Sequence, residues 1–280
     1  MRSRFVAYVT LPHFTPLTIV VVVTGLLAWM IDGSSLSGAE LGRLLLAMLG
    51  GQLLVGITNE LIDSDADRLS KPSKPIPAGL VSRRGAVLFS AGGLILMLVA
   101  GSSFGALSFS ILLIGTGTGI AYSLWFKRSP FAWLPYLIAL PLLPIWVAVS
   151  LDCFEPALLL LYPLGALAVL GVQLAQSIPD IDADRAAGID SVTTRLGESR
   201  ALWLCWGSLL GSLVLAIIGS VVRVGWSRPV ELAGLVVLGL VALDVGLYRW
   251  NRRIGVMAAF PCAAVSTALL SLAWLASIYR

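Results

Sequence analysis

Charge, histidine and cysteine are all scarce in this chain of 280 residues, and each shortage excludes a class of protein. Only 12% of the residues are charged and 58% are hydrophobic, whereas soluble domains carry roughly 25% charged residues. The single histidine, His13, and three widely separated cysteines argue against imidazole-based chemistry, a zinc site and a disulfide framework. A net charge of only +4 argues against a nucleic-acid partner.

The abundant apolar residues predict a membrane protein, because a soluble chain of this length could not hide so much apolar surface from water. A spanning helix needs about 20 apolar residues. The first candidate is longer than the apolar core of a signal peptide and lacks a clear cleavage site, so we interpret it as a span. The sequence therefore predicts an all-α, polytopic protein with nine transmembrane helices near 14–31, 39–62, 84–101, 104–124, 131–150, 156–178, 201–222, 229–249 and 254–278.

The basic residues predict the orientation of these helices. If the N-terminus is cytoplasmic, fifteen of the nineteen Lys and Arg residues lie in cytoplasmic segments, as the positive-inside rule requires. We therefore expect a multi-pass protein of the cell membrane. Two acidic loops, near 63–83 and 179–200, are expected to lie on the cytoplasmic side with the N-terminus.

The two acidic loops contain a repeated segment. Residues 59–68 (NELIDSDADR) resemble residues 176–185 (QSIPDIDADR) at a constant offset of 117 positions. Four predicted spans separate the two copies, so the helices that precede them point the same way, as in a parallel internal repeat. The sequence predicts one transmembrane domain over 1–280, with halves of about 1–128 and 129–280, in which the two acidic clusters face each other.

Residue spacing indicates which oxygen ligands act together. Asn59, Asp63 and Asp67 lie at i, i+4 and i+8, on one face of a helix, and Asp180 and Asp184 also lie four residues apart. Carboxylates packed this closely need cations to neutralise them. Hard oxygen ligands suit Mg²⁺, which tends to share its coordination shell with substrate phosphates. The pattern predicts a magnesium site that also binds a phosphate-bearing substrate.

The acidic segments allow two other interpretations. Acidic cytoplasmic loops are often simply solvated, but a repeat with matched flanks argues against that. A calcium-binding EF-hand loop needs Gly at its sixth position and Glu at its twelfth. Those positions hold Arg68 and Lys74 in the first copy and Arg185 and Ser191 in the second, so calcium sensing is rejected.

Basic residues follow the first acidic segment and recur in a third loop. Lys71 and Lys74 stand in a proline-stiffened loop, and Tyr122 precedes Lys127 and Arg128 further along the chain. Lys binds phosphate as a point charge, and cations around a diphosphate stabilise it as a leaving group. For Lys127 and Arg128 the alternative is a topological role alone, as positive-inside anchors.

Segment 59–79 resembles the first signature of the UbiA superfamily of intramembrane prenyltransferases, with its aspartates at fourth spacings and a basic-Pro-x-basic-Pro-Ile tail. Segment 180–197 is similar to the second signature, and the stretch from Tyr122 to Arg128 to a weaker third one. The resemblance covers essentially the whole chain. It implies a ring of nine helices around a central cavity, with Mg²⁺ bridging both acidic motifs to a prenyl diphosphate. It also implies that the prenyl group is transferred to a lipophilic acceptor, which is an aromatic or quinone precursor or another lipid.

The resemblance also implies roles for particular residues. The catalytic residues are Asp63, Asp67, Asp180 and Asp184, which together with Asn59 are also the metal ligands. The residues that bind the diphosphate are Asn59, Lys71, Lys74, Tyr122, Lys127 and Arg128. Four positions depart from the family pattern: Glu60 stands where Asp is usual, Lys71 and Lys74 where Arg is commoner, and Leu11 where Arg often precedes the proline. His13 is interpreted as a packing or capping residue.

Two alternatives to a prenyltransferase stay open at this stage. A membrane terpene cyclase of the same fold would let the allylic cation react with an alkene of the same prenyl chain. A transporter would use the acidic loops to bind a phosphate-bearing solute. Asp244, within the eighth predicted span, is expected to pair with Arg249 or Arg252 rather than to serve a site.

Overall fold

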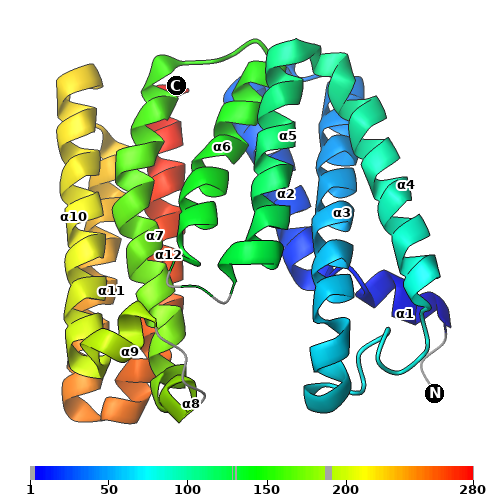
Figure 1. Ribbon diagram of the computed structural model, residues 1–280. Helices are drawn as coiled ribbons and strands as arrows, with labels where there is room; N and C mark the ends of the chain where they lie inside the picture. Colours follow the sequence, from blue (N-terminus) through cyan, green and yellow to red (C-terminus); the bar gives the residue numbers. More distant parts are fainter. Residues whose placement is uncertain (1–3, 128, 130, 187–190, 280) are drawn as a thin grey trace. The chain divides into compact units, whose positions relative to one another are not determined.

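The computed structural model describes residues 4–127, 129, 131–186 and 191–279, and these contain helices and no strand (Figure 1). The prediction of an all-α protein is confirmed. The helices are α1 (Arg4–Thr10), α2 (Phe14–Asp32), α3 (Gly38–Ser70), α4 (Arg83–Gly101), α5 (Gly105–Ala121), α6 (Leu134–Ser150), α7 (Leu161–Ser177), α8 (Ile181–Ala186), α9 (Val192–Leu196), α10 (Glu198–Val224), α11 (Arg228–Trp250) and α12 (Arg252–Ile278).

Seven helical stretches of the described residues are long and apolar enough to cross a membrane. One of them, Arg83–Phe126, contains both α4 and α5, and α6 is a shorter apolar helix of 17 residues. Large apolar side chains lie exposed along α4 and α5, among them Leu88, Val99 and Leu107. Patches of this kind are unfavourable in water, so lipid is the medium that these helices fit.

The helix contacts divide the chain into two compact units. Unit 1 comprises Met1–Lys127 and Leu142–Phe154, and unit 2 comprises Arg128–Pro141 and Glu155–Arg280. In unit 1, α3 packs along α4 and also against α2. A side chain at Gly50 of α3 would place its Cβ 2.6 Å from the backbone oxygen of Gly93 in α4. Small residues thus let these two backbones approach closely, as is common in membrane bundles.

The length of α3 places the acidic residues beyond its apolar part. Its 33 residues span about 50 Å at 1.5 Å per residue, which exceeds the roughly 30 Å hydrocarbon core of a bilayer. The helix begins at a capping box formed by Ser37 and Glu40 and continues through Ser70 before Pro72 follows. The predicted loop from residue 63 is therefore wrong in its first eight positions, because no proline interrupts the helix before Pro72 and α3 continues through Ser70.

In unit 2, α7, α10, α11 and α12 pack together. Asp244 of α11 is buried, and its Oδ2 accepts a hydrogen bond of 2.7 Å from the indole nitrogen of Trp206. The expected pairing of Asp244 with Arg249 or Arg252 is wrong. Arg252 instead forms an ion pair with Glu198 at 2.5 Å, because α12 begins beside the first turn of α10.

Candidate functional site

A continuous series of close polar contacts joins seven side chains of unit 1 around the last turns of α3. They come from four segments: the start of α2, α3 itself, the loop that follows α3, and the end of the helix that contains α5. In order of contact they are Asp63, Lys127, Asn59, His13, Glu60, Lys74 and Asp67. We call this set the α3 polar cluster.

Lys127 lies near one end of the α3 polar cluster, where it contacts Asp63 and Asn59. Its Nζ donates a hydrogen bond of 3.1 Å to Asn59 Oδ1 and forms an ion pair with Asp63. A π-helix, Tyr122–Phe126, directly precedes Lys127, and the Lys127 backbone nitrogen donates to the Tyr122 oxygen at 2.8 Å. π-Helical turns are rare and concentrate at functional sites. This turn sets the direction in which the Lys127 side chain leaves its helix.

Lys74 forms the other end of the cluster. Its Nζ lies 2.7 Å from Asp67 Oδ2 and 2.6 Å from Glu60 Oε1. Burial alone lowers the pKa of Lys74, but its hydrogen bonds to Asp67 and Glu60 outweigh that effect, and the pKa lies above its usual value. Lys74 is therefore an ammonium ion at neutral pH. Ile76, two residues on, is buried in an apolar cluster with Ile57 of α3, which anchors the loop.

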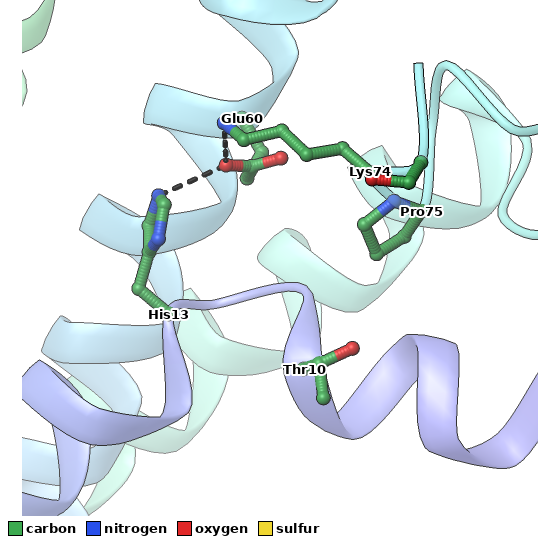
Figure 2. A pocket seen from close by; sticks show the side chains of 6 residues that line it. Thr10, His13, Glu60, Lys74 and Pro75 are labelled. Atoms are coloured by element: carbon green, nitrogen blue, oxygen red, sulfur yellow. Dashed lines mark hydrogen bonds and ion pairs between the residues drawn. The ribbon is translucent and has the colours of Figure 1, made fainter. Parts of the chain in front are cut away.

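In the α3 polar cluster, His13 lies between Asn59, which contacts Lys127, and Glu60, which contacts Lys74. Its Nε2 lies 2.9 Å from Glu60 Oε1 (Figure 2) and 3.1 Å from Asn59 Nδ2. Because one ring nitrogen either carries a hydrogen or accepts one, Nε2 donates to Glu60 in one tautomer and accepts from Asn59 in the other. The residue has φ 54° and ψ 69°, a left-handed conformation that is uncommon outside glycine. His13 stands at the N-cap of α2, but its side chain makes no capping hydrogen bond, so the interpretation as a capping residue is wrong.

A cavity of about 200 Å³ opens beside His13, Glu60 and Lys74 and is also lined by Thr10, Ser73 and Pro75 (Figure 2). The Glu60 side chain is only 3% exposed. Both of its described partners contact Oε1, and no described residue donates a hydrogen bond to Oε2. Glu60 therefore belongs to the wall of the cavity rather than to its open side.

Five of the residues predicted from sequence meet in the α3 polar cluster: Asn59, Asp63, Asp67, Lys74 and Lys127. The side chain of Lys71 is exposed at the end of α3, and Tyr122 lies in the π-helix. Arg128 lies outside the described residues. Asp180, in a short 3₁₀ turn, is exposed, and Asp184 lies half-buried in α8; both belong to unit 2.

Sequence reasoning missed two members of the cluster. Glu60 was noted only as a departure from the usual Asp, and His13 was interpreted as a packing or capping residue. One signal could have found Glu60: a carboxylate adjacent to Asn59 on an otherwise apolar helix needs a cation, and Lys74 is the cation available in the next loop. No sequence signal shows the left-handed conformation of His13.

The long apolar helices define the chain as a membrane protein. The model of the UbiA prenyltransferase family matches residues 18–260, and the chain belongs to this family. It is 31% identical over 165 residues to digeranylgeranylglyceryl phosphate synthase of Natronomonas pharaonis, an alignment that covers 58% of this chain and 57% of that protein. It is 28% identical to glycinol 4-dimethylallyltransferase of Glycine max, over 52% of this chain and 40% of that protein. The chain thus spans less than two thirds of the length of these two relatives.

Solved structures of the same fold agree with this membership. A structure of digeranylgeranylglyceryl phosphate synthase matches with a TM-score of 0.77 at 16% identity, over 98% of this chain and 97% of that chain. A UbiA homologue from Archaeoglobus fulgidus, bound to GPP and Mg²⁺, matches with a TM-score of 0.67 at 16% identity, over 95% of this chain and 99% of that one. At such low identity the likeness shows the fold.

Proposed function

We propose that this protein is an intramembrane, Mg²⁺-dependent prenyltransferase that moves a prenyl group from a prenyl diphosphate to a lipophilic acceptor. The observation that carries the proposal is the α3 polar cluster, in a chain of the UbiA prenyltransferase family. Lysines and hard oxygen ligands held together at the end of one apolar helix are the groups that a metal–diphosphate complex requires. Relatives named as a synthase and as a dimethylallyltransferase support the same class of reaction.

The oxygen ligands of the cluster fit Mg²⁺. No three His, Cys, Asp or Glu side chains converge as a ready-made metal cage in the part of the chain that the structure describes. Mg²⁺ is usually bound through only one or two carboxylates, with phosphates and water completing its shell. Asn59, Asp63 and Asp67 would hold it at the end of α3, and Asp180 and Asp184 are the further ligands proposed from the second acidic segment. When bound, Mg²⁺ supplies Lewis-acid charge that stabilises the diphosphate as a leaving group.

The basic residues complete the proposed site. Lys74 and Lys127 donate hydrogen bonds to phosphate oxygens, and Lys71, Arg128 and Tyr122 supply further donors from neighbouring positions. The allylic C–O bond of the prenyl diphosphate breaks, and its electron pair leaves with the diphosphate. An electron pair of the acceptor then forms the new bond to the allylic carbon, and the acceptor releases a proton to water.

The proposed topology has nine spans in a ring around a central cavity, with a cytoplasmic N-terminus. Gly105, at φ 83°, follows the turn Ser102–Phe104 and separates α4 from α5, which supports counting the stretch Arg83–Phe126 as two spans (Figure 1). The short apolar helix α6 is the ninth. Labelling of single cysteines placed at residue 35 and at residue 78 with a membrane-impermeant maleimide tests the orientation, and only the second should be protected in intact cells.

The experiment that tests the activity is turnover in nanodiscs. Radiolabelled prenyl diphosphates of several chain lengths are incubated with host lipid extract or with a monoprenylated glyceryl phosphate, with Mg²⁺ or with EDTA. Asp63→Asn is compared with Asp65→Asn, because Asp65 is exposed on the same helix and, among the described residues, forms ion pairs with Arg83 and Arg68 alone. We expect Mg²⁺-dependent label in a new lipid, which Asp63→Asn abolishes and Asp65→Asn retains.

Other outcomes would replace the proposal. Labelled hydrocarbon formed without any acceptor would indicate a cyclase. Movement of the diphosphate across the bilayer without its consumption would indicate a transporter. Failure of the folded wild type to bind or consume any prenyl diphosphate would reject prenyl transfer.

A further inference from the structure

We propose that His13 and Glu60 are positioning residues that hold the Lys74 ammonium group at the end of α3, where it donates to the bound diphosphate. This inference rests on the proposed function, since it assigns residues to the diphosphate end of the same site. Neither His13 nor Glu60 has a role in the sequence pattern that identified the site.

The contacts on Glu60 Oε1 carry the first step of the argument. This one oxygen lies 2.6 Å from Lys74 Nζ and 2.9 Å from His13 Nε2. The Glu60 side chain is 3% exposed, whereas the Lys74 side chain is 21% exposed. An ionised carboxylate only accepts hydrogen bonds, so Glu60 cannot donate to a phosphate oxygen, and its effect passes through the lysine that it holds.

The hydrogen-bonding capacity of Lys74 gives the second step. An ammonium group has three hydrogens to donate. Asp67 and Glu60 take one each, and Lys74 lines the cavity of about 200 Å³ beside them (Figure 2), so the third hydrogen has room to meet a phosphate oxygen. A lysine side chain is flexible and loses much rotamer freedom when it binds a ligand. Two anchors remove that freedom before the diphosphate arrives.

The backbone at His13 gives the third step. A non-glycine residue in the left-handed region is uncommon, and such backbone strain often marks a functional position. The preceding Pro12 packs so tightly on α3 that a Cβ on Gly56 would lie 2.6 Å from the Pro12 oxygen. The chain therefore reaches His13 along a fixed path, and the imidazole meets the Glu60 oxygen that also binds Lys74.

A binding experiment with a double-mutant cycle tests this positioning role. The probe is a prenyl thiolodiphosphate, which resists cleavage, and its Kd is measured with Mg²⁺ for the full chain in nanodiscs. The variants are Glu60→Gln, Lys74→Met and the pair combined. His13→Asn is added because Asn tolerates the left-handed backbone and lacks the imidazole. Asp65→Asn serves as the matched control, with the same loss of one charge on the exposed side of α3.

We expect Glu60→Gln to raise the Kd about tenfold and His13→Asn about threefold, while Asp65→Asn leaves it unchanged. If Glu60 acts through Lys74, the two substitutions are coupled, so Glu60→Gln changes the Kd less than twofold when Lys74→Met is already present. A merely structural role for Glu60 would weaken binding equally in both backgrounds.

Three results would overturn the inference. They are an equal effect of Glu60→Gln with and without Lys74, tighter binding in Glu60→Gln, and no effect of either Glu60→Gln or His13→Asn. If Glu60→Gln does not fold, His13→Asn combined with Lys74→Met completes the same cycle. Failure of the proposed function looks different, since the wild type itself would then not bind the thiolodiphosphate in the presence of Mg²⁺.

Discussion

The two acidic segments share the sequence DADR and yet have different surroundings within their own units. In segment 59–68, Asp63 and Asp67 are buried and each is paired with a lysine. In segment 176–185, Asp180 is exposed, and no ion pair of Asp180 or Asp184 with another described residue is found. The comparison teaches that a repeat of acidic residues does not by itself repeat the site around them.

Two substitutions between the copies explain the difference. Pro179 stands where the first copy has Ile62, and an interior proline kinks or breaks an α-helix because it lacks the N–H and clashes with the preceding turn. As a result α7 ends at Ser177, whereas α3 continues to Ser70. The residue that matches Lys74 is Ser191, so the second segment has no lysine of its own at that position.

Exchanging Ile62 and Pro179, the matched residues of the two acidic segments, should have the largest effect. Ile62→Pro should interrupt α3 just before Asp63, at a cost of about 3 kcal/mol or more, and abolish both thiolodiphosphate binding and turnover. Pro179→Ile removes the break after α7 and should shift the adjacent proposed ligand Asp180, so turnover should fall about tenfold, less than in Ile62→Pro. Turnover and circular dichroism in nanodiscs measure both, and full activity of Ile62→Pro would show that the helix is not what places these carboxylates.

Removal of matched carboxylates should separate their effects on activity and stability. Asp67→Ala and Asp184→Ala should each lower kcat/KM by at least about 100-fold, because both remove proposed metal ligands. Only Asp67→Ala should also lower the melting temperature, by about 2–4 °C, since it takes one of two partners from the partly buried Lys74. Equal melting temperatures for the two variants would contradict the structural contrast.

Adding a methyl group at Gly56 of α3 tests whether the packing of Pro12 on α3 holds His13 in place. Gly56→Ala should push the Pro12 backbone away from α3, displace His13 from Glu60 and raise the Kd for the thiolodiphosphate about threefold. The control is Gly42→Ala on the same helix, where an added Cβ meets no atom within 4 Å. Gly42→Ala should leave the Kd unchanged, and an equal change in both variants would mean that the contact at Pro12 is irrelevant to binding.

The smallest expected effect concerns pH in the absence of metal. The pKa of Lys74 lies above its usual value of 10.5, so its pairing stabilises the folded state fully below about pH 10.5. That contribution is lost as the pH rises through the higher folded-state pKa. Melting temperatures measured between pH 9 and 11.5 should therefore fall more for wild type than for Lys74→Met. Parallel curves would show that Lys74 is not bound in this way.

Composition and spacing predicted the helical membrane fold and five members of the α3 polar cluster, because hydrophobic length and fourth spacings are local properties of the sequence. Other features depend on contacts between distant residues. The pairing of Asp63 depends on Lys127, which is 64 residues away in sequence. The proposed role of His13 depends on a backbone conformation next to the packing of Pro12 on Gly56. Asp244 is a similar case, since its partner Trp206 is 38 residues away in sequence.

The π-helix Tyr122–Phe126 makes the number of residues in this segment as important as their identity. A π-turn accommodates one residue more than the α-helical turn that it replaces, and one residue of an α-helix corresponds to about 100° of rotation. Deletion of a single residue here would restore a regular helix and turn the next side chain away from Asn59 and Asp63. Insertions and deletions in the segment should therefore be tolerated far less than substitutions, and a homologue one residue shorter would have to supply its cation from another position.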